Sequence, residues 1–127
     1  MTTINKSMLG AIAANDDLPP IPDYVQALSF MDLRQPRGSG VKFWNVEPTG
    51  VYGEDCLRGK ECARELLDYV AAHPTNGNMY LLSWIVCDMA SRGVDHRGEP
   101  VLKGHMIAFM NEIASSAVAW EYVRANQ

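Results

Sequence analysis

The sequence predicts a mainly α-helical fold: a compact bundle of about four helices with one short β-hairpin or lone strand over residues 41–52. Three observations support this prediction. Apolar residues recur at spacings of three and four in several long segments, prolines and glycines separate these segments, and one short segment is rich in β-branched and aromatic residues. The 127 residues fit one domain that can bury a core without disulfides or a metal.

The first part of the chain is predicted to be an arm. Residues 1–21 are expected to form this N-terminal arm, either flexible or lying along the body, because a proline run ends any helix begun within it. Residues 22–127 are expected to form a single helical domain. Asp23 is a suitable N-cap for a first helix, which Pro36 ends. The apolar face of that helix comprises Tyr24, Leu28 and Met31.

The β-rich segment follows a Gly-Ser-Gly link. Residues 41–46 are the best candidate strand, and residues 47–50 have the composition of a turn. Residues 51–52 can pair back to close a short hairpin. Because an isolated hairpin is marginal in water, we expect it to lie against the helices or to pair with another strand.

Three further helices are predicted over residues 55–73, 78–92 and most of 101–125. Gly59 weakens the first turns of the earliest of these. The second is apolar on almost every side, which indicates a central position, although a buried strand competes over residues 80–86. The predicted core comprises Leu66, Leu67, Val70, Leu82, Ile85, Val86, Phe109 and Ile113.

Charge and hydropathy exclude several classes of function. The net charge of −4 is spread along the chain without a basic cluster, so nucleic acid is not an expected partner. The longest apolar run, residues 79–87, is far shorter than the roughly 20 residues that span a bilayer. The N-terminal apolar run is short and weakly hydrophobic for a signal peptide. We therefore expect a bacterial or phage-like cytoplasmic protein with no membrane segment.

The three cysteines do not have the spacing of a metal site. Cys56 and Cys62 are six residues apart and Cys87 is remote, whereas structural zinc sites use closely spaced pairs. The sequence therefore predicts no bound metal and no cofactor. Cys62 and Cys87 are expected to be buried, while Cys56 is expected to be more exposed near a helix N-terminus.

One polar loop carries residue types suited to acid–base chemistry. Asp95, His96 and Glu99 lie in this loop, and His105 follows in the last predicted helix. These four residues are the candidate catalytic groups. The same composition is equally typical of an ordinary solvated turn.

Two tryptophans are candidate interaction residues. Trp44 lies on the predicted strand and Trp120 near the end of the last helix, and tryptophan is enriched at interface hot spots. The last helix also carries a run of small residues, 114–119, that allows another helix to approach closely. Together with the exposed strand edge, these features predict a homodimer, with a further unidentified protein partner possible.

The sequence therefore favours a non-enzymatic protein-interaction or regulatory module, mainly because no catalytic motif, metal-ligand spacing or basic patch is present. The alternative is a small enzyme or small-ligand-binding protein that uses the loop Asp95–Glu99 with His105.

Overall fold

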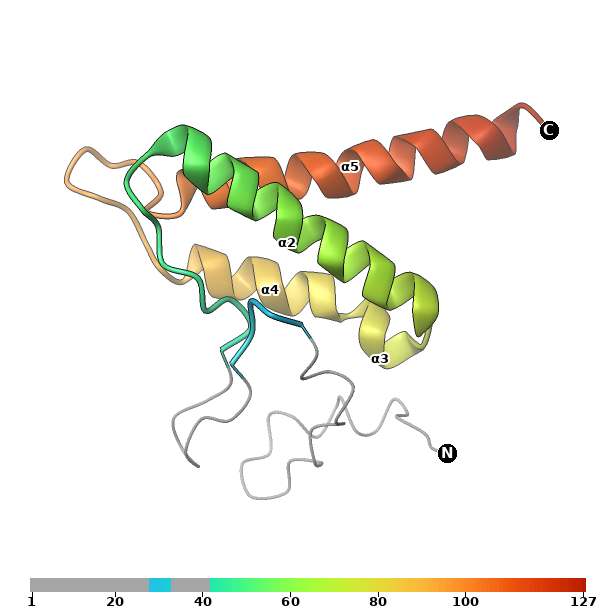
Figure 1. The fold of residues 1–127 in the computed structure, drawn as a ribbon, viewed down its shortest axis with the longest axis horizontal. Coiled ribbons are helices and arrows are strands. Elements are labelled where there is room, and N and C mark those ends of the chain that lie inside the picture. The colour runs from blue at the N-terminus through green and yellow to red at the C-terminus, as the bar shows by residue number, and fades with distance from the viewer. Residues whose placement is uncertain (1–27, 33–41) are drawn as a thin grey trace, which may run out of the picture. The chain divides into compact units, whose positions relative to one another are not determined.

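The computed structural model describes residues 28–32 and 42–127 (Figure 1). These residues fall into two compact units. The first contains residues 28–32, residues 42–46 and Tyr69–Asp88, and the second contains Glu47–Asp68 and Met89–Gln127. The predicted arm, residues 1–21, and most of the predicted first helix lie outside the described residues.

The described part of the chain is mainly helical, as predicted. Its helices are α2 (Tyr52–Ala72), α3 (Asn76–Met79), α4 (Leu81–Ala90) and α5 (Lys103–Ala125). In this part of the chain, no helix is both long enough and apolar enough to cross a membrane.

The predicted first helix is wrong where the structure describes it. Residues 28–32 form a turn and an isolated antiparallel bridge, in which Asp32 and Lys42 exchange both backbone hydrogen bonds at 2.8 and 3.1 Å. The backbone of Asn45 also donates to the carbonyl of Phe30 at 2.7 Å. These long-range bonds outweigh the local helical preference of the segment.

The strand or hairpin predicted over 41–52 is not confirmed. Among the described residues of that range, the chain forms no strand beyond the bridge at Lys42, and α2 already begins at Tyr52. The carboxylate of Asp88 occupies the backbone donors that a hairpin would use: it accepts from the N–H groups of Phe43 and Trp44 at 2.7 and 2.9 Å.

A carboxylate near its first turn supports the start of α2. Asp55 Oδ1 accepts hydrogen bonds from the Thr49 N–H at 2.9 Å and the Thr49 hydroxyl at 2.8 Å. The hydroxyl of Thr49 in turn accepts from the Val51 N–H at 3.1 Å. Gly50, with φ +87°, makes the turn before the helix possible. Asp55 and Glu54 also suit the positive end of the helix dipole.

The helix predicted over 78–92 is two helices. Thr75 is the N-cap of α3 and accepts from the Asn78 N–H at 3.2 Å, so Asn78 is not the cap that its sequence position indicated. The side chain of Asn78 instead donates to the carbonyl of His73 at 2.8 Å. Beyond α4, Gly93 adopts φ +77°, the left-handed conformation expected after a helix C-terminus.

The core of the first unit is aromatic. Trp44 is 2% exposed, and its ring lies 5.3 Å from that of Phe30, which is fully buried. Phe43 stacks on Trp84 at 5.4 Å. Leu81 and Ile85 of α4 are buried as well.

The core of the second unit lies along α2 and the N-terminal half of α5. Buried side chains there include Cys62, Ala63, Leu66, Leu102 and Phe109. The core prediction is confirmed for Leu66, Ile85 and Phe109 and wrong for the other five residues, which are half-buried: Leu67, Val70, Leu82, Val86 and Ile113. Cys62 is buried as predicted, whereas the prediction for Cys87 is wrong, since its side chain on α4 is exposed.

Candidate functional site

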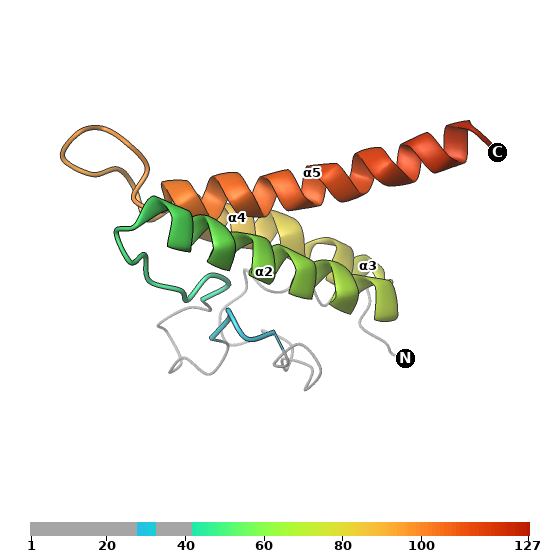
Figure 2. The same ribbon diagram turned by 45° about the horizontal axis from the view of Figure 1, so that its top comes forward.

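The C-terminal half of α5 exposes several large apolar side chains to solvent. Phe109, in the N-terminal half, is fully buried. Beyond it, the segment Ala114–Ala125 exposes four large side chains by 50–68%: Val118, Trp120, Tyr122 and Val123. Figures 1 and 2 both show this end of the helix diverging from α2. A helix end with this composition is normally covered by another surface.

The exposed side chains of this segment do not share one face. Trp120 and Val123 continue the stripe that contains Phe109 and Ile113, at helical steps of three and four. Val118 and Tyr122 lie on another side, in line with Ile107. The charged residues of the segment, Glu121 and Arg124, pair with each other at 2.6 Å. The segment is therefore apolar round most of its circumference, with its charges neutralised.

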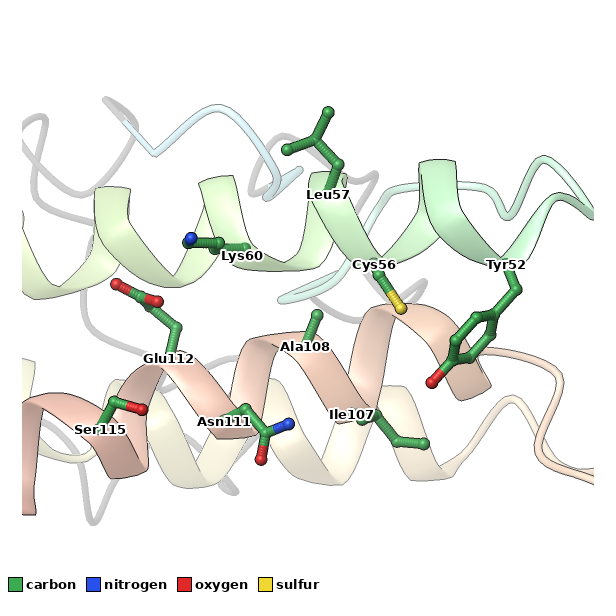
Figure 3. Close-up of a pocket in the computed structure, with 9 residues that line it drawn as sticks. All are labelled: Tyr52, Cys56, Leu57, Lys60, Ile107, Ala108, Asn111, Glu112 and Ser115. Atoms are coloured by element: carbon green, nitrogen blue, oxygen red, sulfur yellow. The ribbon is translucent and has the colours of Figure 1, made fainter.

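A groove of about 410 Å³ lies between α2 and α5, beside this segment (Figure 3). Its lining combines apolar residues, such as Ile107 and Ala108, with polar ones, such as Lys60 and Asn111. An ion pair between Arg64 and Glu112 at 2.8 Å joins the two helices at the end of the groove. From α2 the groove is lined by Tyr52, Cys56, Leu57 and Lys60, and from α5 by Ile107, Ala108, Asn111, Glu112 and Ser115.

Tyr52 and Cys56 lie at one end of the groove. A hydrogen bond with the Cys56 side chain raises the pKa of the Tyr52 hydroxyl, and the electrostatic interaction between the two side chains acts in the same direction. The thiol is half-buried there, so Cys56 is more exposed than Cys62, as predicted, but less exposed than Cys87.

Two glycines let α2 and α5 approach closely. A Cβ at Gly59 would collide with the backbone carbonyl oxygen of His105, and one at Gly104 would lie 2.8 Å from the Cβ of Asp55. The sequence reasoning attributed to Gly59 a weakened helix start and did not single out Gly104. The available signal was a glycine inside an otherwise helical pattern, which commonly marks close packing.

The helix crossing buries a histidine beside a carboxylate. His105 is 1% exposed, and its Nε2 lies 3.7 Å from Asp55 Oδ1. Burial alone would raise the pKa of Asp55, but the hydrogen bonds from Thr49, with smaller contributions from His105 and Gly50, hold that pKa below its ordinary value.

The pKa of His105 is lowered from its ordinary 6.5. Burial is the main cause; Asp55 acts in the opposite direction, Arg58 and Arg92 lower the pKa further, and Glu47 raises it. The buried imidazole is therefore neutral at pH 7. A neutral imidazole fills the space between the helices and adds no charge of its own beside the Asp55 carboxylate.

This pair predicts a loss of stability in mild acid. Below pH 6.5 an unfolded chain protonates His105 more readily than the folded chain, so the free energy of unfolding should fall as pH falls. One proton gives a slope of at most about 1.4 kcal/mol per pH unit. Urea denaturation at pH 7.5, 6.5 and 5.5 measures this slope. A His105→Gln variant should flatten it, and an unchanged slope in that variant would contradict the assignment.

The predicted catalytic loop is organised around its own backbone. Asp95 Oδ1 accepts from the N–H groups of Arg97 and Glu99 at 2.8 and 3.1 Å, which lowers the pKa of that carboxyl. Glu99 pairs with Lys103 at 2.8 Å. His96 is exposed on the loop. The structure thus brings Asp95 and Glu99 together in one turn and places His105 beside Asp55.

The other predicted site residues differ in exposure. Trp44 is buried against Phe30, so its indole does not present a surface to a partner, whereas Trp120 is 63% exposed. Within residues 28–32 and 42–127, no cluster of three or more histidine, cysteine or acidic side chains is arranged to hold a metal ion.

Comparison of the chain with protein-family models, with curated proteins and with solved structures gave no match.

Proposed function

We propose that this chain is a non-enzymatic protein-interaction module of the cytoplasm that pairs with a second copy of itself through the C-terminal half of α5. The observation behind this proposal is the exposure of Val118, Trp120, Tyr122 and Val123 on a segment that is apolar on most sides. Burying apolar surface against a partner is favourable by about 25 cal/mol per Å², and a segment left in water does not gain this free energy.

A second copy suits this segment better than a strongly charged partner. Glu121 and Arg124 neutralise each other, so the segment does not repel its own copy. The small residues at 114–117 and 119 permit close approach of two helix backbones. A two-fold arrangement uses the same surface twice and leaves no open end, and it is the commonest form of self-association.

Light scattering after gel filtration at micromolar concentration tests the proposal. The wild-type chain should have the mass of a dimer, and a Val118→Glu/Trp120→Glu double variant should have the mass of a monomer. The double variant places a charge on both exposed sides of α5, so it disrupts a contact on either side.

Val94→Glu is the matched control, because Val94 is also 63% exposed and lies in the loop before α5, outside its C-terminal half. It should leave the dimer intact. A wild-type chain that is monomeric up to high micromolar concentration would overturn the proposal, provided that circular dichroism shows the helices to be folded.

The alternative, an enzyme or small-ligand binder that uses Asp95–Glu99 with His105, has weaker support. The carboxylate of Asp95 accepts hydrogen bonds from the backbone of its own turn, and the carboxylate of Glu99 pairs with Lys103. His105 is 1% exposed and lies against Asp55, which leaves its ring little access to a substrate.

A further inference from the structure

One exposed stripe of α5 runs along the groove and on to the free end of the helix. Ile107, Asn111, Ser115, Val118 and Tyr122 follow one another by four, four, three and four residues and therefore share a face. All five are exposed, Ile107 by 41% and both Val118 and Tyr122 by 68%. The stripe carries no charge, so it brings no like charges together when it meets its own copy.

The stripe is symmetric about its small centre. Ile107 lies seven residues before Ala114, and Tyr122 lies seven residues after Ser115. Asn111 and Val118 lie three residues from the same two positions. An antiparallel copy centred on Ala114–Ser115 therefore places Tyr122 of one chain against Ile107 of the other, at both ends of the pair. The small residues at the centre let the two helices come close enough for these end contacts to form.

The groove lies at the Ile107 end of this stripe. It is bounded there by Tyr52 and Cys56 of α2 and by Ile107 of α5 (Figure 3). The groove is shallow and open, and its volume of about 410 Å³ leaves room for an aromatic side chain to lie along it. Lys60 and Asn111, which also line the groove, offer hydrogen-bond partners to a phenolic hydroxyl.

From these observations we infer that the groove is the docking site for Tyr122 of a second copy, so that the two α5 helices pair antiparallel about Ala114–Ser115. This inference rests on the proposed function and specifies its contact. Trp120, on the opposite side of the helix from Tyr122, lies outside the contact.

The expected contact area agrees with a stable pair. From Ile107 to Tyr122 the helix rises about 23 Å. A tyrosine side chain has roughly 150–250 Å² of surface, and about two thirds of the Tyr122 surface is exposed. Burying Tyr122 of both copies, together with an equal area of the groove that each one covers, removes about 400–700 Å² from solvent. Ile107, Val118 and the helix centre of each copy must bury the rest of the roughly 1,000 Å² that a specific interface needs.

Cysteine cross-linking tests the register. In a Cys56→Ser/Cys87→Ser background, Ser115→Cys lies beside the two-fold axis and should form a disulfide-linked dimer under mild oxidation. Ala119→Cys, one turn further along the same exposed helix, lies about 13 Å from its copy along the axis and should remain unlinked. Linkage at 119 without linkage at 115 would overturn the register.

Side-chain variants test the occupant of the groove. Tyr122→Ala should weaken dimerisation at least tenfold in light scattering or analytical ultracentrifugation, while Trp120→Ala should leave it within about twofold. In the wild-type dimer a thiol reagent should modify Cys56 more slowly than in the Tyr122→Ala chain, while exposed Cys87 reacts at the same rate in both.

The two proposals fail in different ways. A dimer that survives Tyr122→Ala and separates with Trp120→Glu would overturn the groove assignment and retain the interaction module. A folded chain that is monomeric at every concentration would overturn both. Circular dichroism of each variant checks that the helices remain folded, which we expect because positions 115, 119 and 122 are exposed.

Discussion

Replacing Phe109 by alanine is expected to lower the free energy of unfolding by about 3–5 kcal/mol. The Phe109 side chain is fully buried in the N-terminal half of α5. Removing the ring deletes buried apolar surface and leaves a cavity that the surrounding helices fill only in part. Urea denaturation followed by the helical circular dichroism signal measures the change.

Met110→Ala is the matched control for this prediction. Met110 is the next residue of α5 and is 39% exposed, so its truncation should change the free energy of unfolding by no more than about 0.5 kcal/mol. Equal denaturation midpoints for the two variants would mean that α5 does not pack through Phe109.

The long helices could be predicted from the sequence because their signals are local. The apolar spacings and the flanking Pro74 and Gly93 predict α2 and α5 to within a few residues and also predict where α4 ends. The failures lie where distant residues decide the conformation. The carboxylate of Asp88 accepts hydrogen bonds from the backbone of Phe43 and Trp44, which lie 45 and 44 residues away in the sequence. No local sequence pattern predicts such a contact.

The candidate site could be predicted only in part for a similar reason. The sequence places Phe109, Ile113 and Trp120 on one stripe, but periodicity does not tell where the cover over that stripe ends. Phe109 proves to be buried and Trp120 exposed, which makes the far end of α5 a surface rather than core. The groove face with Ile107 and Tyr122 was missed because its polar members, Asn111 and Ser115, interrupt the apolar pattern.

The contact between α2 and α5 predicts opposite effects for two glycines of the same helix. Gly59→Ala should lower the free energy of unfolding by about 1–3 kcal/mol, because the new Cβ collides with the backbone of His105. A backbone atom held in a helix cannot move aside as the end of a flexible side chain can. Gly53→Ala should instead be neutral or raise the free energy of unfolding by up to about 1 kcal/mol.

Gly53 is a suitable control because it lies in α2 and has nothing within 4 Å of the position that a Cβ would occupy. At Gly53 the substitution therefore changes stability only through the better helix propensity of alanine. At Gly59 the same gain is outweighed by the steric collision. Urea denaturation of both variants under the same conditions measures the two changes in the free energy of unfolding.

The nuclear magnetic resonance signals of the His105 amide and ring should also shift in Gly59→Ala and stay in place in Gly53→Ala, since only the first substitution displaces the His105 backbone. A stabilising effect at both positions would show that α2 and α5 do not approach as closely as Gly59 and Gly104 indicate, and the burial of His105 beside Asp55 would then lose its structural basis.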